Sequence, residues 1–152
     1  MSNTVVCACA SILVTIVAAG CHGHLKMTPK EIDEMSQTCR SKIDGGKSLA
    51  QRSERIGYRP GFEHEPAVVI YGAAWCDACH IAADYLTRRG IPHVDKDIEL
   101  DDAVRAEMLK TMVSAGLKVP ERAVDIPVVA ARGLVTIGFN PCAIEETWGR
   151  GG

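Results

Sequence analysis

Residues 67–80 read AVVIYGAAWCDACH and join a continuous apolar run to two cysteines that are separated by two residues. An apolar run of this length is typical of a β-strand that is buried on both faces. A helix is then expected to start near Cys76 and to run to Arg89, with Gly90 as its stop. The stretch therefore predicts a strand that leads directly into a helix, with Cys76 and Cys79 at the junction.

A second strand and a second helix are expected downstream. Residues 91–100, IPHVDKDIEL, supply the strand. A strand, a helix and a strand within about 30 residues form a right-handed crossover between parallel strands. Asp101 is expected to cap the next helix, which ends at Gly116.

The last part of the chain predicts a hairpin and a final helix. Two apolar runs, residues 126–131 and 134–139, flank Arg132-Gly133 and are interpreted as antiparallel strands. Asn140 and Pro141 then begin a short helix that runs through Trp148. The expected fold class is α/β, with the order β-α-β-α-β-β-α and a central mixed four-stranded sheet.

A short helix is expected ahead of this unit. Residues 28–31, Thr-Pro-Lys-Glu, combine an N-cap, a proline at the first helical position and a glutamate three residues after the cap. Apolar side chains follow at helical spacing, at Ile32, Met35, Cys39 and Ile43. Residues 47–66 show no clear period and are interpreted as a loop. We therefore expect a tether, this helix and a connecting loop over residues 21–66, and a domain over residues 67–149.

The N-terminal segment predicts export. Residues 1–20 carry no charged side chain, and their apolar stretch has the length of a signal-peptide core. It is short for a membrane span, which needs about 20 apolar residues. Residues 17–21, VAAGC, resemble the lipobox of bacterial lipoproteins, so Cys21 would carry a lipid and anchor the protein to a membrane at the periplasmic side of the cell envelope. A plain secretory signal and an uncleaved anchor are the alternatives.

Length and charge narrow the functional class. The chain has 152 residues and a formal net charge of −2. This length allows one domain, or a short domain with a targeting segment. The balanced charge offers no basic surface for nucleic acid, so no nucleic-acid partner is expected. We also expect a monomer.

Export changes how the cysteines are interpreted. Two of the 7 cysteines would leave with the signal and Cys21 would be acylated. Four remain in an oxidising compartment, where disulfides persist: Cys39, Cys76, Cys79 and Cys142. Cys142 has three possible roles, as a structural partner of Cys39, as a third redox thiol or as an inert buried cysteine. Export and the even number favour the structural pair.

Several spaced features of residues 67–149 resemble a thioredoxin-fold protein of the glutaredoxin branch. These are the element order, the Cys76-x-x-Cys79 pair at the first strand–helix junction, and Asp125-Ile126-Pro127 at the opening of the third strand. Residues 88–99, RRGIPHVDKDIE, are similar to the glutaredoxin stretch between helix and second strand, whereas the Trp75-Cys76 pair resembles thioredoxin. The resemblance implies a thiol–disulfide oxidoreductase.

The resemblance also implies roles for individual residues. A thiol at a helix N-terminus faces unpaired N–H groups and the positive end of the helix dipole, which favour the thiolate that attacks disulfides. Cys76 is therefore expected to be the nucleophile and Cys79 the resolving thiol. A cis bond before Pro127 would turn the main chain of Ile126 toward an incoming peptide. Trp75 could gate the site or pack beside the strand end.

Protein disulfides are the expected substrates, with glutathione as a possible co-substrate. Glutaredoxins usually place a Lys or Arg shortly before the first cysteine, and Ala73, Ala74 and Trp75 stand there in this chain. Their Gly-Gly-x-Asp near the last helix is reduced to residues 138–141, Gly-Phe-Asn-Pro. The helix N-terminus at Pro141 could still receive a carboxylate through its N–H groups. No cofactor is expected.

Two other chemistries use the same motif. A c-type haem would be attached through Cys76 and Cys79 with His80 as axial ligand, and it needs a small helical body. Alternatively, the same three residues could hold Cu(I) or Zn with one of the scattered histidines, His22, His24, His64 or His93. The buried strands around the motif favour the thiol–disulfide interpretation, in which His80 is simply a polar residue on the helix and no metal ligand is assigned.

Overall fold

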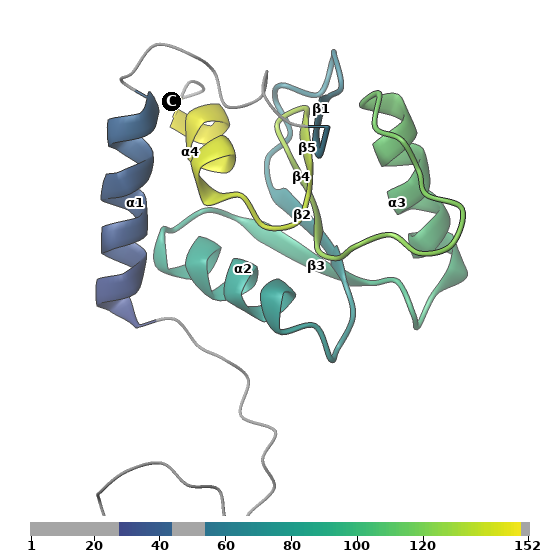
Figure 1. The fold of residues 1–152 in the computed structure, drawn as a ribbon, viewed down its shortest axis with the longest axis horizontal. Coiled ribbons are helices and arrows are strands. Elements are labelled where there is room, and N and C mark those ends of the chain that lie inside the picture. The colour runs from purple at the N-terminus through teal and green to yellow at the C-terminus, as the bar shows by residue number, and fades with distance from the viewer. Residues whose placement is uncertain (1–27, 44–53, 150–152) are drawn as a thin grey trace, which may run out of the picture.

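The computed structural model describes residues 28–43 and 54–149, which form a mixed sheet covered by helices on both faces (Figure 1). Nine elements follow one another along the chain: α1 (Pro29–Ile43), β1 (Ile56–Tyr58), β2 (Val68–Gly72), α2 (Asp77–Arg88), β3 (His93–Asp97), α3 (Asp102–Ser114), β4 (Val128–Ala131), β5 (Leu134–Ile137) and α4 (Pro141–Gly149). Helices α2 and α4 lie on one side of the sheet and α3 lies on the other.

The five strands have the order β1-β5-β4-β2-β3. Strand β2 is parallel to β3 and antiparallel to β4, while β4 and β5 form an antiparallel hairpin. At the hairpin turn, Arg132 and Gly133 both have positive φ, 46° and 82°. Positive φ at both central residues is the conformation of a type I′ turn, whose twist matches that of the flanking strands.

Alternation along the central strands divides the core into two layers, because successive side chains of a strand point to opposite faces. One layer lies between the sheet and helices α2 and α4, and it includes Val68, Ile70, Ala82, Leu86, Val129 and Ile144. The other layer lies under α3 and includes Tyr71, Met108, Met112, Val128, Ala130 and Val135. The α/β fold predicted for the main unit is therefore confirmed.

The sheet has five strands, so the expected sheet of four is wrong by one strand. The additional strand, β1, lies within residues 47–66, which we interpreted as a loop. Its three residues pair antiparallel with β5, and Tyr58 N–H donates to Ala115 O at 3.2 Å. A Cβ on Gly57 would lie 2.3 Å from Ala115 O, so only glycine fits there. A three-residue strand with a central glycine gives no readable period, which is why the pattern missed it.

The helix boundaries follow the expected caps. Before α1, Thr28 N–H donates to Glu31 Oε2 at 2.7 Å, and Glu31 N–H donates to Thr28 Oγ1 at 3.3 Å, which completes a capping box. The hydrogen bonds that the Glu31 carboxylate accepts, first from Thr28 N–H and then from Thr28 Oγ1, hold the pKa of Glu31 below its usual value. Asp101 caps α3 through a hydrogen bond from Ala103 N–H at 2.7 Å, and Asn140 caps α4 through one from Ala143 N–H at 3.1 Å.

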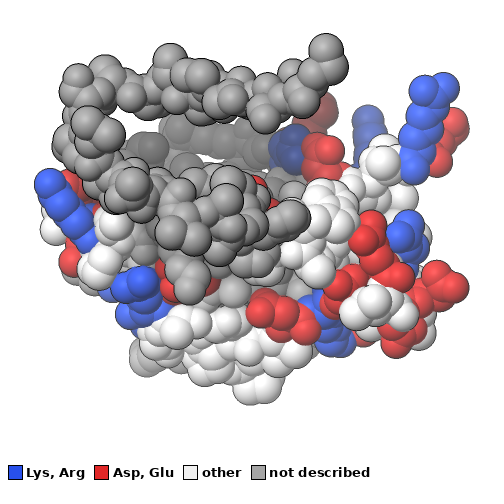
Figure 2. Space-filling model, turned by 90° about the horizontal axis from the view of Figure 1, so that it is seen from below, with Lys and Arg blue, Asp and Glu red and all other residues white. Residues whose placement is uncertain are grey.

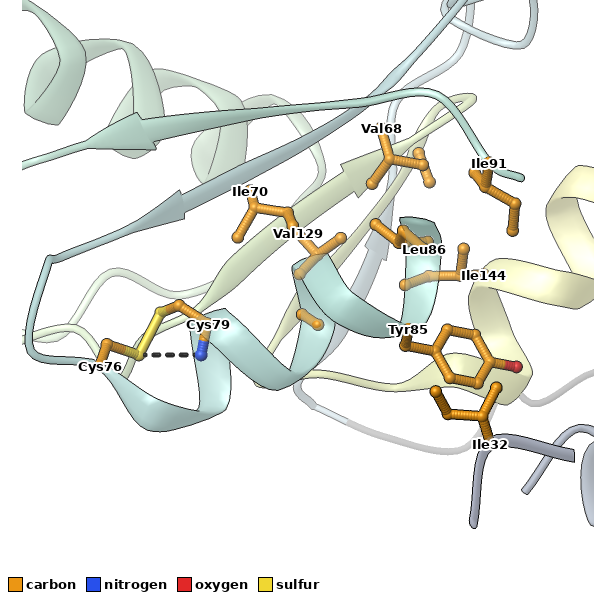
Figure 3. Packing of buried hydrophobic residues seen from close by; sticks show 12 residues of the cluster. Ile32, Val68, Ile70, Cys76, Cys79, Tyr85, Leu86, Ile91, Val129 and Ile144 are labelled. Carbon is orange, nitrogen blue, oxygen red and sulfur yellow. Dashed lines mark hydrogen bonds between the residues drawn. A yellow bond between two sulfur atoms is a disulfide. The ribbon is translucent and has the colours of Figure 1, made fainter. Parts of the chain in front are cut away.

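Helix α1 packs against α2 and α4, at the end of α2 that lies away from Cys76 (Figure 3). Cys39 of α1 and Cys142 of α4 are joined in a disulfide with an S–S distance of 2.03 Å. Beside it, Glu145 accepts hydrogen bonds from Ser36 Oγ, Tyr85 OH and Arg89 Nε. Burial is the main cause that raises the pKa of Tyr85 well above its usual value, and the hydrogen bond to Glu145 raises it further.

On the face seen in Figure 2, lysine and arginine side chains lie among aspartate and glutamate side chains. No helix within residues 28–43 and 54–149 is long and apolar enough to cross a membrane. The signal, the lipidation of Cys21 and the tether that the sequence predicts fall outside the described residues.

Candidate functional site: a cysteine pair at the start of α2

Cys76 occupies the N-cap position of α2. Its main chain is extended, with φ −84° and ψ 98°, and its Sγ accepts a hydrogen bond from Cys79 N–H at 3.2 Å (Figure 3). A tight turn before the helix is closed by Cys76 N–H, which donates to Ala73 O at 3.0 Å. The N-terminal N–H groups of a helix and its dipole both stabilise negative charge, so this position favours Cys76 as a thiolate once the pair is reduced.

The two cysteines are joined to each other and are nearly buried. Their sulfurs form a disulfide, and Cys76 and Cys79 are 5% and 7% exposed. Both belong to the core layer beneath α2, where Ile70 and Val129 extend from the sheet. The pair is therefore held by the core on one side and by the first turn of α2 on the other.

Gly72 determines how closely α2 approaches the sheet, and sequence reasoning missed it. A Cβ on Gly72 would lie 2.6 Å from Cys79 Sγ and 3.0 Å from Cys79 Cβ. Glycine is the only residue that leaves room for the cysteine at this distance. The signal was present in the sequence as a glycine at the end of a buried strand, four residues before the first cysteine.

His80 also lies at the site, although the sequence suggested that it is only a polar residue on the helix. Its Nε2 lies 2.9 Å from Ala74 O, so the second turn of α2 contacts the loop that precedes Cys76. His80 and Cys79 together line a cavity of about 160 Å³, whose other walls come from β2, the loop after it and β3.

Trp75 is 66% exposed, so it does not pack beside the strand end. Its Nε1–H donates to Glu99 Oε2 at 2.8 Å. The indole borders a hollow of about 350 Å³ that extends to Ile126 and includes apolar side chains of Ile98, Met108, Leu109, Val119 and Val124. The charged residues Glu99, Arg105, Glu121 and Arg122 also line the hollow, and an exposed aromatic side chain beside such a surface is suited to contact with a polypeptide.

Ile126 and Pro127 form the other wall of this region. The peptide bond between them is cis, and Pro127 is buried immediately before β4. Ile126 packs against both core layers. Within residues 54–149, no hydrogen bond engages the main-chain N–H or C=O of Ile126.

The features expected of a glutathione site are partly absent. Ala73, Ala74 and Trp75 precede Cys76, so no cationic side chain stands there. At the start of α4, the N–H of Ala143 is already bonded to Asn140 Oδ1 at 3.1 Å. One of the N–H groups that could receive a carboxylate is therefore used by the protein's own cap.

The two alternative chemistries find little geometric support. Among the described residues, no three His, Cys, Asp or Glu side chains lie close enough together to hold a metal ion. His22 and His24 lie outside the described residues. The α/β fold is also not the small helical body that the haem alternative requires.

The β2-α2-β3 crossover, the cysteine pair at the start of α2 and the cis-proline before β4 define a thioredoxin-fold protein. Residues 68–133 match the sequence model of the family described as glutaredoxin. Residues 68–133 therefore form a glutaredoxin-like domain of the thioredoxin fold, a class whose members generally act as thiol–disulfide oxidoreductases on thiols and disulfides of proteins. No curated protein matches the chain.

Proposed function

We propose that this protein exchanges disulfides with protein substrates through Cys76 and Cys79. The Cys76 thiolate attacks a substrate disulfide and forms a mixed disulfide, and Cys79 then attacks Cys76 Sγ and releases the substrate thiol. The observation that carries this proposal is the position of Cys76. Its sulfur lies at the N-cap of α2, where it accepts the N–H of Cys79, within disulfide distance of Cys79 Sγ.

The surroundings of the pair support a polypeptide as the substrate. Trp75 is exposed beside an apolar hollow, and Ile126 carries a main chain that makes no hydrogen bond within residues 54–149. An extended substrate segment can therefore pair with the N–H and C=O of Ile126 while its side chain enters the hollow. The absence of a cation before Cys76 makes glutathione the weaker candidate.

The site of action in this proposal is the periplasmic side of the cell envelope. The uncharged segment at residues 1–20 serves as the export signal, and Cys21 at the end of VAAGC carries a lipid that holds the protein on a membrane. Labelling of the full chain with a radioactive fatty acid in the producing cell tests this. Label on the wild type and none on Cys21→Ala is the expected result, and equal labelling of both overturns the lipidation.

Trapping of reaction intermediates tests the exchange itself. In Cys79→Ser the mixed disulfide cannot be resolved, so the variant is expected to accumulate on substrate proteins as adducts that a reductant releases. The control is Cys76→Ser/Cys79→Ser, which keeps the fold and lacks both sulfurs. Adducts in the single variant only support the proposal, and equal adducts in both variants, or adducts in neither, contradict it.

A further inference from the structure

Behind the cysteine pair lies a cavity that the exchange chemistry described above leaves unexplained. It has a volume of about 160 Å³, enough for a few water molecules, and its polar walls are formed by His80, Asp95, Lys96 and Asp97. Cys79 lines the same cavity, whereas Trp75 lines the other hollow. Strand register brings the acidic residues there, because Asp95 and Asp97 pair with Ile70 and Gly72 of β2.

The resolving step creates a need for such a cavity. When Cys76 is bound to a substrate, Cys79 must lose its proton before its sulfur can attack, because the thiolate is the nucleophile. Cys79 is only 7% exposed, and its sulfur lies against Gly72. A buried thiol in such surroundings resists ionisation unless a nearby group accepts the proton.

We propose that His80 accepts the proton of Cys79 through water in this cavity, so that His80 is a positioning and proton-accepting residue for the resolving step. The inference rests on the proposed exchange function. The Cys79 proton passes to the imidazole, and the thiolate attacks Cys76 Sγ to form the Cys76–Cys79 disulfide. The bond between Cys76 and the substrate sulfur breaks, and its electron pair leaves on that sulfur. The pair is oxidised by two electrons, the substrate disulfide is reduced, and the imidazolium returns the proton to the departing thiolate or to solvent.

The hydrogen bond of His80 fixes which nitrogen can accept the proton. A carbonyl oxygen only accepts, so the Nε2 atom that lies 2.9 Å from Ala74 O must carry hydrogen. In the neutral imidazole the lone pair is therefore on Nδ1, and protonation there leaves the bond to Ala74 intact. His80 thereby holds the loop before Cys76 in either protonation state.

Other charged side chains lie near His80 on α2 and line the cavity from β3. Asp77 lies one turn earlier on α2, and Asp95 and Asp97 line the cavity from β3. The Lys96 ammonium is instead bound to Glu107 of α3 at 2.7 Å, on the other face of the sheet. Asp97 is already engaged by the main chain, because its Oδ1 accepts hydrogen bonds from Glu99 N–H at 2.8 Å and from Leu100 N–H at 3.3 Å. Asp95 is exposed, which leaves His80 as the better placed group.

The test separates the two steps with 5,5′-dithiobis(2-nitrobenzoate) added to the full chain after selective reduction of Cys76 and Cys79. Attack by Cys76 releases one coloured thiolate, and resolution by Cys79 releases a second in a phase whose rate does not depend on reagent concentration. His80→Gln keeps a donor for Ala74 O but has no proton-accepting nitrogen. We expect the first phase to stay within about twofold and the second to slow about tenfold or more.

Three further readouts distinguish proton transfer from a structural effect. The rate of the wild-type second phase is expected to decrease on acidification through the range in which histidines take up protons. The second phase of His80→Gln is expected to show no such decrease. Added imidazole is expected to accelerate the second phase of His80→Ala. The matched control is His93→Gln, because His93 also bonds a carbonyl, Ile91 O at 3.1 Å, but does not line the cavity. It should leave both phases unchanged.

The outcomes keep this inference separate from the proposed function. An unchanged second phase in His80→Gln, or equal slowing in His93→Gln, overturns the role of His80 while the first phase still shows Cys76 as the nucleophile. Loss of both phases in the wild type contradicts the exchange function itself. A slow second phase in His80→Gln that keeps the wild-type pH profile also overturns proton acceptance by His80.

Discussion

Residues 28–43 and 54–149 contain two disulfides in contrasting surroundings. Cys76 and Cys79 are three residues apart and share one helix start, beside a cavity and an apolar hollow. Cys39 and Cys142 are 103 residues apart and join α1 to α4, where Cys39 is completely buried. The first bond closes almost no chain and so contributes little loop entropy, whereas the second closes a loop of most of the described chain.

The contrast indicates that the two bonds have different roles, one reactive and one structural. A bond that closes a short loop at a helix N-terminus can break and form again without loss of the fold, since the core layers hold its ends. The other bond lies against Glu145, whose carboxylate links Ser36 of α1 to Tyr85 and Arg89 at the far end of α2. We therefore assign the Cys76–Cys79 bond to chemistry and the Cys39–Cys142 bond to stability.

The largest expected effect is on turnover. Cys76→Ser removes the nucleophile and is expected to abolish disulfide exchange, measured as reduction of a disulfide-containing polypeptide. Its thermal midpoint should stay within a few degrees of the wild type, because the bond closes only a short loop. Residual exchange above a few per cent would mean that another thiol carries the reaction.

Removal of the Cys39–Cys142 bond should have the opposite effect, a loss of stability with exchange retained. Cys39→Ala/Cys142→Ala is expected to lower the free energy of unfolding by about 4–5 kcal/mol, the chain-entropy value for a loop of about 100 residues. Exchange measured well below the thermal midpoint should persist. Chemical denaturation gives the stability, and a double variant as stable as the wild type would remove the structural assignment.

A smaller effect is expected where the backbone meets the reactive pair. Gly72→Ala places a methyl group 2.6 Å from Cys79 Sγ, so the cysteine or the strand must shift. Overpacking of this kind costs about 1–3 kcal/mol, and we expect the release of substrate by Cys79 to slow as well. Gly149→Ala is the control, because a Cβ there meets no atom within 4 Å. Equal effects of the two variants would contradict the close packing.

The smallest effect is expected at alkaline pH, near the Cys39–Cys142 bond. The pKa of Tyr85 is raised in the folded state by burial and by its hydrogen bond to Glu145. The resulting stability is fully present below the unfolded value, about pH 10, and is lost as pH rises further, by at most about 1.4 kcal/mol per pH unit. Tyr85→Phe should lack this contribution. Identical alkaline slopes of unfolding free energy in the wild type and Tyr85→Phe would show that the pKa of Tyr85 is not raised in the folded state.

Local signals in the sequence predicted most of the fold. The caps at Thr28, Asp101 and Asn140, and the stop at Gly90 with its φ of 66°, are interactions between residues a few positions apart. Such interactions can be read directly from sequence spacing. Strand β1 could not, because its pairing with β5 and its approach to Ala115 join distant parts of the chain.

For the candidate site, too, the sequence predicts the local motif but not the contacts between distant residues. Cys76 and Cys79 follow from the motif, since strand and helix patterns flank it. The contacts of Gly72 and His80 depend instead on the distance between α2 and the sheet, which no spacing encodes. The links that Glu145 makes to Ser36 and Arg89 cross 109 and 56 residues and likewise become visible only in three dimensions.

The central claim is tested most directly by comparing how readily each of the two disulfides is reduced. The full chain is equilibrated in a graded series of reduced and oxidised dithiothreitol, free thiols are alkylated, and mass spectrometry reports each cysteine separately. We predict that Cys76 and Cys79 become reduced together while Cys39 and Cys142 remain joined, and that the pair re-forms when oxidant returns. Reduction of Cys39–Cys142 first, or a Cys76–Cys79 bond that does not exchange, would contradict the division between a reactive and a structural disulfide.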